Sequence, residues 1–335
     1  MSELIVVLPG DGIGPEVAAV AIEVLGVLPL DVTVEEHLFG GAAIDATGSP
    51  LPDETLEAAR GAHAVLLGAV GGPQWDGGSV RPEAGLLGLR QALDVYANIR
   101  PAAQGDVDLV VVRELVGGLY FGARGVRDDG TVFDTCEYHP DEIRRIVRRG
   151  FELARSRRGS LTSVDKANVL DTSRLWRRIV EELAADYPDV ELRHALVDSA
   201  AMDLVTNPER FDVIVTENMF GDILSDVAAA VTGGLGLAAS ASLGDAGPGI
   251  FEPVHGSAPD IAGTGAANPA AMLRSVALML THAFDRADLA SAVERAVESA
   301  LVSSPTPDLG GSATTAEFSR SVIARLEDAW TTAPS

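Results

Sequence analysis

The sequence predicts an α/β fold in which a central sheet is covered by helices on both faces. Short β-branched runs alternate along the chain with longer amphipathic stretches, and this alternation is typical of α/β layers. The length of 335 residues and the hydrophobic content of 47% allow a large core and favour roughly two domains. No repeat or long linker interrupts the chain, so we expect any division into domains to arise where the chain crosses back.

Each expected element rests on its own pattern. Buried strands are expected where apolar, β-branched residues run together, at residues 4–9, 64–70, 108–115, 160–165 and 211–218. Helices are expected where apolar residues recur every three or four positions, at residues 15–26, 141–158 and 172–187.

Composition excludes several classes of function. The 25 basic and 49 acidic residues give a formal charge of -24, which repels nucleic-acid backbones and anionic membranes. The single cysteine, Cys136, cannot form an internal disulfide and fits a reducing compartment. The apolar run at 4–9 is too short for a signal sequence, and the uncharged stretch 227–244 is too rich in small residues to span a membrane. We expect a cytoplasmic protein with no nucleic-acid or membrane partner.

The stretch PGDGIGPE, residues 9–16, joins the first expected strand to the first expected helix. Its glycines, Gly10, Gly12 and Gly14, follow the spacing G-x-G-x-G. Pro15 stands where the Rossmann dinucleotide fingerprint requires its third glycine, and proline suits the start of a helix. The stretch therefore predicts a tight strand-to-helix turn and not a Rossmann fold.

Two aspartates, Asp222 and Asp226, are spaced i and i+4, which places both on one face of a helix expected just after the strand at 211–218. Like charges stacked in this way repel, and a divalent cation would reverse that cost. Oxygen ligands alone suit Mg²⁺ or Mn²⁺ and not zinc, and Asp198 is a candidate for a further ligand. A second interpretation stays open, in which Asp222 caps the helix and Asp226 is solvated.

Arginines recur through one stretch and the strand that follows it, at Arg81, Arg90, Arg100 and Arg113. A guanidinium binds a carboxylate through two parallel hydrogen bonds, so arginines that converge on one cleft suit a di- or tricarboxylic acid. Leu86 and Leu87 precede Arg90 by one turn of an expected helix. Most arginines in proteins are simply solvated, and these four are open to that interpretation.

Lys166 is the only lysine in the chain. A strong compositional bias toward arginine could have left it by chance. An amine, however, can serve as a proton acceptor when neighbours and burial lower its pKa, whereas a guanidinium stays protonated. The single lysine is therefore also a candidate catalytic base.

Eight short motifs occur in order over nearly the whole chain: PGDGIGPE, FGGAAIDATG, LLGAVGGPQWD, RPEAGLLGLRQALDVYANIRP, RELVGGLYFG, SVDKANVL, NMFGDILSD and FEPVHGSAPDIAG. In these motifs the chain resembles the isopropylmalate dehydrogenases of the metal-dependent β-decarboxylating dehydrogenase family, which are related to isocitrate dehydrogenases. The resemblance implies a two-domain sandwich with a mixed central sheet. Residues 1–99 and 233–335 would form a discontinuous NAD-binding domain, and residues 100–232 a second domain for dimerisation and catalysis.

The resemblance also implies a set of site residues. The catalytic residues would be Tyr120 and Lys166. The substrate would be bound by Arg90, Arg100, Arg113, Asp198, Glu83, Leu86, Leu87, Asn168 and Val169. The metal ligands would be Asp222 and Asp226, with Asp198 supplied by the partner subunit of a homodimer. By residue type alone, Tyr120 could equally be a tyrosine packed at the end of a strand.

The cofactor residues implied by the resemblance lie in one late segment: Glu252, His255, Gly256, Ser257, Ala258, Asp260, Ile261 and Asn268. His255 and Asn268 would face the adenine, and Asp260 would hydrogen-bond the ribose hydroxyls. A carboxylate at that place repels a 2′-phosphate, so NAD is expected over NADP. A lone histidine such as His255 is otherwise more often a core or surface residue.

The activity implied is the oxidative decarboxylation of (2R,3S)-3-isopropylmalate to 4-methyl-2-oxopentanoate and CO₂ in leucine biosynthesis, with Mg²⁺ or Mn²⁺ as the cation. Leu86 and Leu87 favour a branched alkyl group and penalise a desolvated carboxylate. Sister enzymes acting on D-malate, tartrate, isocitrate or homoisocitrate share the skeleton and stay as alternatives. A regulatory relative without catalysis also remains open, although Lys166, Tyr120 and all three aspartates are present.

Overall fold

The structure is a computed structural model and describes residues 2–331. Its contacts divide the chain into two compact units, Met1–Leu93 with Leu235–Ser335, and Asp94–Gly234. The outer ends of the expected NAD-binding domain, residue 1 and residues 332–335, lie outside the described residues. The first unit is discontinuous, because the chain leaves it after strand β3 and helix α4 and returns at β11.

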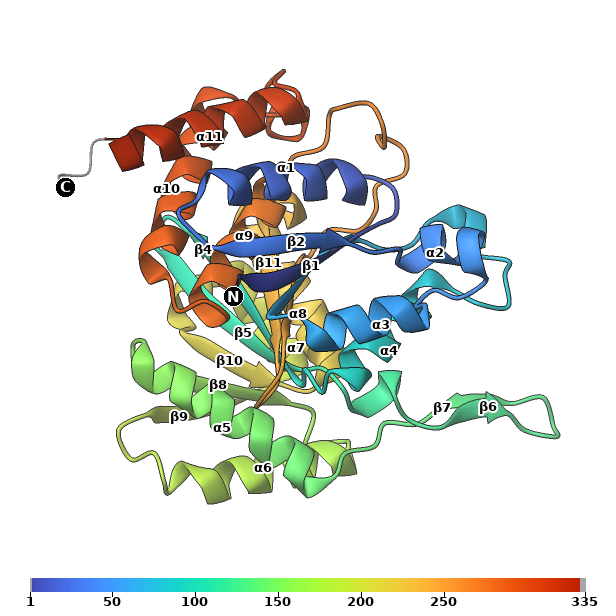
Figure 1. Cartoon of the computed structure of the whole chain (residues 1–335). Coiled ribbons are helices and arrows are strands. Elements are labelled where there is room, and N and C mark those ends of the chain that lie inside the picture. The colour runs from blue at the N-terminus through green and yellow to red at the C-terminus, as the bar shows by residue number, and fades with distance from the viewer. Residues whose placement is uncertain (1, 332–335) are drawn as a thin grey trace. The chain divides into compact units, whose positions relative to one another are not determined.

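The first unit is a mixed sheet covered by helices (Figure 1). Its strands are β1 (Glu3–Gly10), β2 (Val32–Glu36), β3 (Ala64–Ala69), β11 (Ala239–Leu243) and β12 (Gly249–Pro253). Its helices are α1 (Gly14–Val27), α2 (Gly40–Thr47), α3 (Asp53–Gly61), α4 (Pro82–Ala92), α9 (Ala270–His282), α10 (Ala287–Ser303) and α11 (Thr315–Thr331). The strand order is β2-β1-β3-β12-β11, parallel except where β11 pairs with β12.

The second unit contains a five-strand order, β4-β5-β10-β8-β9, in which β4 and β5 are antiparallel and the others parallel. These strands are β4 (Ala97–Gln104), β5 (Val107–Glu114), β8 (Ser160–Asp165), β9 (Glu191–Leu196) and β10 (Val213–Thr216). Its helices are α5 (Pro140–Ser156), α6 (Asp171–Ala184), α7 (Val197–Thr206) and α8 (Asn218–Val231). A hairpin of β6 (Arg124–Val126) and β7 (Val132–Asp134) extends away from this sheet (Figure 1).

The alternation of side chains across the strands explains the layers of the second unit. Ile214 packs with Leu224 of α8 and Leu204 of α7 in one buried cluster. Its neighbour Val215 points to the opposite face, where it lies against Gly150 of α5. Because successive residues of a strand face opposite sides, α5 and α7–α8 cover different faces. The predicted sheet with helices on both faces is confirmed for this unit.

The predicted elements are confirmed with small shifts at their ends. The strand predicted at 211–218 is shorter, since β10 ends at Thr216 and α8 begins at Asn218. The turn predicted at 9–16 joins β1 to α1, with Gly10 and Gly12 at positive φ angles of 71° and 59°, a conformation that glycine adopts without steric cost. Of the helices within residues 2–331, not one combines the length and apolar content needed to cross a membrane.

Candidate active site

Helix α8 presents the paired aspartates of the second unit. Glu217 caps the helix by accepting a hydrogen bond from the Phe220 N–H at 2.8 Å, so the prediction that Asp222 could be the cap is wrong. The other half of that alternative, a solvated Asp226, agrees with a side chain that is 53% exposed. Asp222 and Asp226 lie one turn apart within the helix, and their side chains therefore share a face. Burial raises the pKa of Asp226, which the nearby Arg100 opposes and the Asp222 carboxylate reinforces.

Two of the predicted arginines converge on this face. Arg113, at the end of β5, is almost fully buried and donates through Nη1 to Asp222. Arg100, on β4, places Nη1 3.5 Å from an Asp222 oxygen and 3.6 Å from an Asp226 oxygen. The alternative that these two arginines are merely solvated is therefore wrong. They surround the carboxylates with donors that are desolvated and held in place.

Tyr120 completes this group. It ends a short 3₁₀ turn, Gly118–Tyr120, and its hydroxyl donates to Asp222 Oδ2 at 2.9 Å. The Arg113 guanidinium carbon lies 5.6 Å from the centre of the tyrosine ring, within the range of a cation–π contact. Burial and then the Asp222 carboxylate raise the pKa of Tyr120. The phenol therefore stays protonated at neutral pH and can act as a proton donor.

The carboxylates fit a hard divalent cation, but only in part. Asp222 and Asp226 supply oxygen ligands alone, as Mg²⁺ and Mn²⁺ prefer. In the part of the chain that is described, no three His, Cys, Asp or Glu side chains gather into a metal-binding set. The Asp198 of the same chain therefore does not complete the pair, and further ligands would come from substrate, water or another subunit.

Lys166 and Asp198 form a separate pair in the same unit. The Lys166 amine, just after β8, donates to Asp198 Oδ1 in the first turn of α7, and this bond holds the pKa of Asp198 below its usual range. The Asp198 side chain is 63% exposed and that of Lys166 27%. Asn168 and Val169, predicted to bind substrate, are exposed in the turn after Lys166, where the Val169 N–H donates to the Lys166 carbonyl at 3.0 Å.

Helix α4 carries the predicted substrate residues of the first unit on one face. Glu83, Leu87 and Arg90 are spaced i, i+4 and i+7, and Leu86 lies one turn before Arg90. Arg90 is buried and donates through Nη2 to Glu252 at 2.7 Å. Its Nε, also buried, meets no hydrogen-bond partner within residues 2–331. A buried donor left unpaired is costly, and a carboxylate ligand would satisfy it.

The predicted cofactor loop is fixed by the turn after β1. The Ile13 N–H donates to the Ser257 carbonyl at 2.8 Å, and a Cβ added to Gly12 would stand 2.0 Å from that same oxygen. Ala258 has a positive φ of 38°, which is uncommon for a residue other than glycine and concentrates at functional sites. The glycine-rich stretch therefore supports this loop by close backbone approach.

His255 offers a ligand contact in the same loop. Its Nδ1 bonds the Gly256 carbonyl at 2.9 Å and must carry the hydrogen, which leaves Nε2 as an acceptor. Burial lowers the pKa of His255 and keeps the ring neutral. Nε2 is buried and has no partner among the residues that the structure describes. An amino group such as that of adenine would satisfy it.

The other predicted cofactor residues differ in their surroundings. Asn268 is buried and structural in part, since its Oδ1 accepts from the Ala270 N–H at 3.0 Å at the start of α9 and its Nδ2 donates to Asp308 at 3.0 Å. Asp260 and Ile261 are exposed. Exposure suits a carboxylate that binds ribose hydroxyls at the mouth of a cofactor site.

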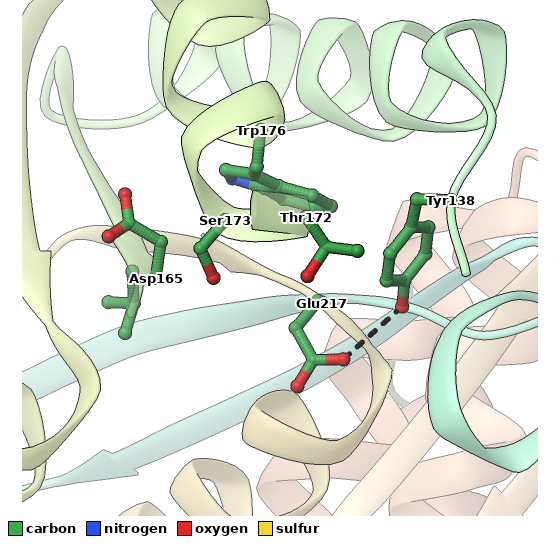
Figure 2. Close-up of a pocket in the computed structure, with 7 residues that line it drawn as sticks. Tyr138, Asp165, Thr172, Ser173, Trp176 and Glu217 are labelled. Carbon is green, nitrogen blue, oxygen red and sulfur yellow. Dashed lines mark hydrogen bonds between the residues drawn. The ribbon is translucent and has the colours of Figure 1, made fainter. Parts of the chain in front are cut away.

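A second polar group, which sequence reasoning missed, lies behind the loop of Tyr120. Figure 2 shows Tyr138 and Glu217 pointing toward one another in a pocket also lined by Asp165, Thr172, Ser173, Trp176 and Val164. Glu114 is fully buried and accepts from the N–H groups of Val116 and Gly117 at 3.0 and 2.9 Å. Burial raises its pKa to about 7. This group anchors the backbone that carries Tyr120.

Two asparagines that sequence reasoning also missed hold the arginines. The Oδ1 atom of Asn98 accepts from Arg100 Nε at 2.7 Å, and that of Asn218 accepts from Arg113 Nε at 3.0 Å. Asn98 and Arg100 are two residues apart on one strand and therefore share a face, a signal that could have been found. Asn218 is 105 residues from Arg113, and no local pattern links them.

Arginines that converge on paired carboxylates, on an α/β framework, define an enzyme suited to a small acidic substrate. Residues 4–322 match the isocitrate/isopropylmalate dehydrogenase family, and the chain belongs to this family. The 3-isopropylmalate dehydrogenase of Bacillus anthracis is 51% identical, covering 98% of this chain and 98% of its own. That of Streptococcus pneumoniae is also 51% identical, covering 97% of this chain and 100% of its own.

Solved structures agree with the fold. The isocitrate dehydrogenase of Methylococcus capsulatus aligns with a TM-score of 0.90 at 40% identity, covering 97% of this chain and 99% of its own. A beta-decarboxylating dehydrogenase of Thermococcus kodakarensis aligns with a TM-score of 0.85 at 40% identity, covering 99% and 98%. The predicted family and its mixed α/β fold are confirmed, and the chain is a dehydrogenase of this family.

Proposed function

We propose that the chain catalyses the NAD-dependent oxidative decarboxylation of (2R,3S)-3-isopropylmalate to 4-methyl-2-oxopentanoate and CO₂, a step of leucine biosynthesis. The observation that carries the substrate is the face of α4, where Leu86 and Leu87 lie beside the buried Arg90. Two half-buried leucines stabilise a branched alkyl group by a few kcal/mol and disfavour a desolvated carboxylate. An isocitrate enzyme would need polar groups at this place to meet a further carboxylate.

The arginines bind the carboxylates of the malate part of the substrate. Arg100 and Arg113 are only 8% and 2% exposed, so their charge is poorly screened and strong toward an anion. Arg90 contributes its unpaired Nε. Planar guanidinium groups also fix the orientation of each carboxylate, which presents the C2 hydrogen and hydroxyl in one geometry.

Asp222 and Asp226, with Asp198 of a partner subunit, would hold Mg²⁺ or Mn²⁺. Such an ion acts as a Lewis acid on the oxygens of the substrate. Asp222 also fixes Tyr120, through the hydroxyl bond at 2.9 Å. The same aspartate therefore links the metal site to the proposed proton donor.

Two side chains move protons. Lys166 would accept the proton of the C2 hydroxyl, with NAD as the acceptor of the C2 hydride. The amine is bonded to Asp198, and its final placement would come from whatever covers this exposed pair. The resulting β-keto acid loses CO₂. Tyr120 then protonates the enolate carbon, a role open to a phenol that carries its proton at neutral pH.

The cofactor is NAD, bound by the loop from Glu252 to Asn268. His255 Nε2 accepts from the adenine amino group, and the exposed Asp260 accepts from the ribose hydroxyls. The carboxylate of Asp260 would repel the 2′-phosphate of NADP.

The active form is a homodimer with shared sites. Three apolar side chains of α7 and α8, Met202, Val205 and Ile223, are exposed, and such residues gathered on adjoining helices mark an interaction surface. The exposed Asp198 lies on the same helix α7.

We place the enzyme in the cytoplasm, where a chain with the single cysteine Cys136 stays reduced.

The test is NADH formation by the purified protein with Mg²⁺, offering 3-isopropylmalate, isocitrate, homoisocitrate, D-malate and tartrate separately. Each assay is repeated with a chelator. A clear preference for 3-isopropylmalate that the chelator abolishes is the expected result. Preference for another acid would overturn the role of Leu86 and Leu87. No NADH formation with any of the five acids would favour a regulatory relative without catalysis.

A further inference from the structure

We propose that two buried asparagines, Asn98 and Asn218, are positioning residues that orient the substrate-binding arginines through neutral acceptors. The Nε of each arginine donates to a neutral amide oxygen, which leaves more of its positive charge for the substrate than a carboxylate at that place would. The inference rests on the proposed function only in that Arg100 and Arg113 bind the malate carboxylates.

Asn218 is held by hydrogen bonds of both its side chain and its backbone. It is fully buried, and its Oδ1 accepts from both Nε and Nη2 of Arg113, at 3.0 and 2.7 Å. Its Nδ2 donates to the Gly117 carbonyl at 2.9 Å, and its backbone N–H donates to the Tyr138 hydroxyl at 3.0 Å. The donation to Gly117 decides which end of the amide is oxygen. The amide therefore meets Arg113 with its acceptor only.

The hydroxyl and the ring of Tyr138 hold Asn218 and the neighbouring backbone in place. Its hydroxyl accepts from the Asn218 N–H and donates to Glu217 Oε2 at 3.3 Å, the bond drawn in Figure 2. Its ring lies so close to the backbone that a Cβ added to Gly117 would meet it at 2.8 Å. Asn218 is thus seated in a packed frame, which in turn holds Arg113 rigidly.

Asn98 serves Arg100 in the same way. It is fully buried on β4, and its Oδ1 accepts from Arg100 Nε at 2.7 Å. The Arg100 Nη1 donates to another neutral group, the Ser225 hydroxyl, at 2.7 Å. Both arginines therefore receive amide oxygens at Nε, where proteins often place carboxylates.

The neutral acceptors at Nε matter because both arginines also lie near carboxylates. Arg113 also meets Asp222, and Arg100 lies near Asp222 and Asp226, the proposed metal ligands. Bonds to those aspartates weaken when a cation draws on the same oxygens. The bonds to the asparagines do not depend on the cation. An additional carboxylate at Nε would cancel charge in a site with little solvent screening.

The test compares two substitutions at one position. Asn98→Asp keeps the shape and adds a negative charge, whereas Asn98→Ala removes the acceptor and adds none. We expect the aspartate variant to raise the KM for 3-isopropylmalate by at least about 10-fold, more than the alanine variant does, with the KM for NAD unchanged in both. If Asn98 only fills space, the isosteric aspartate will be the milder change, and that order overturns the proposal.

Asn207→Asp is the matched control for net charge. Asn207 is an exposed residue of the same unit whose amide donates to Thr206 at 2.9 Å, and this variant should leave both KM values unchanged. Asn218→Asp and Asn218→Ala form a second pair, for which thermal unfolding is measured because the donation to Gly117 is lost in both. Among the variants of Asn218 that fold, we again expect aspartate to raise the KM for 3-isopropylmalate more than alanine does.

Failure of this inference is distinguishable from failure of the proposed function. The wild-type protein is first assayed on the five acids. If it prefers another of them, the substitutions are compared on that acid, since all five share the carboxylates that the arginines would bind. Calorimetric titration of the acid into the Mg²⁺-loaded protein without NAD should give the same order for binding alone.

Discussion

The group around Asp222 and the pair formed by Lys166 and Asp198 lie in the same unit but are supported very differently. Asp222 contacts the buried Arg113 and the hydroxyl of Tyr120, and the arginine is in turn held by Asn218. Lys166 and Asp198 contact each other through side chains that are 27% and 63% exposed. The first group is anchored by the buried Arg113 and Asn218, although the Asp222 side chain is itself 35% exposed. The second has no buried anchor of this kind among its two members.

This contrast indicates which part of the chemistry one chain can preorganise. A buried network of hydrogen bonds fixes its members in one arrangement. An exposed ion pair is worth about 0–1 kcal/mol and does not hold two flexible side chains in place. The geometry of the arginines is therefore settled within the unit. The placement of Lys166 and Asp198 depends on what covers them, which in a homodimer would be the partner subunit.

Substitution of Lys166 should have the strongest effect on activity. Lys166→Met removes the proton acceptor and should lower kcat by about 10³-fold or more, while substrate binding measured by calorimetry changes little. Lys166→Arg is the matched variant, because it keeps the positive charge beside Asp198 but cannot accept a proton. Both variants should be inactive. Substantial turnover by the arginine variant would show that the base lies elsewhere.

Coexpression of two variants tests directly whether Lys166 and Asp198 contribute to the active site of the partner subunit. Asp198→Asn and Asp222→Asn should each lower activity by about 100-fold through loss of cation binding. When the two variants are coexpressed, each mixed dimer would contain one site with both aspartates intact. Random pairing then restores about a quarter of the wild-type activity. No recovery, in mixed dimers verified by mass, would mean that Asp198 acts within its own chain.

We expect Lys166 to contribute to the same active site as Asp198, because the two side chains are bonded to each other. Coexpression of Lys166→Met with Asp222→Asn is therefore expected to restore the same fraction. Coexpression of Lys166→Met with Asp198→Asn should restore nothing, since both changes fall in the part that the partner supplies. This third combination is the internal control.

A smaller effect is expected at Glu114, behind the loop of Tyr120. Its pKa in the folded protein is about 7, against an ordinary value of 4.5, because burial disfavours the carboxylate. The folded state therefore binds this proton more tightly, and stability falls as pH rises through that window. Between about pH 5 and about pH 8 the wild-type protein should lose about 2 kcal/mol of unfolding free energy relative to Glu114→Gln.

Chemical denaturation at both pH values measures this contribution. The comparison is between slopes and not between absolute stabilities, because glutamine cannot accept from both Val116 and Gly117 as the carboxylate does. Glu209→Gln serves as the control, since Glu209 is exposed in the same unit and is not among the groups that shift the pKa of Glu114. Equal slopes for Glu114→Gln and the wild-type protein would place the ionisation of Glu114 well below pH 7.

Local sequence pattern was sufficient to predict some of the elements, among them β1, β3, β5, β8, β10, α1, α5 and α6, and several residues that share their faces. Apolar periodicity predicted the strands and helices, because the burial of one face or both faces of an element depends on the spacing of consecutive residues. The spacing of Asp222 and Asp226, and that of Leu86 and Arg90, placed each pair on one helical face. The motifs of the family supplied the roles of these residues.

The groups that each charged side chain meets became visible only in the folded chain. Arg90 and Glu252 are 162 residues apart, and Arg113 and Asn218 are 105 residues apart, so no window of sequence contains either pair. The pKa of Glu114 likewise depends on its burial and on the charges of Glu142 and Arg145, which lie on another element, helix α5. Secondary structure is set by interactions between near neighbours, whereas desolvation and charge are set by whichever side chains folding brings together.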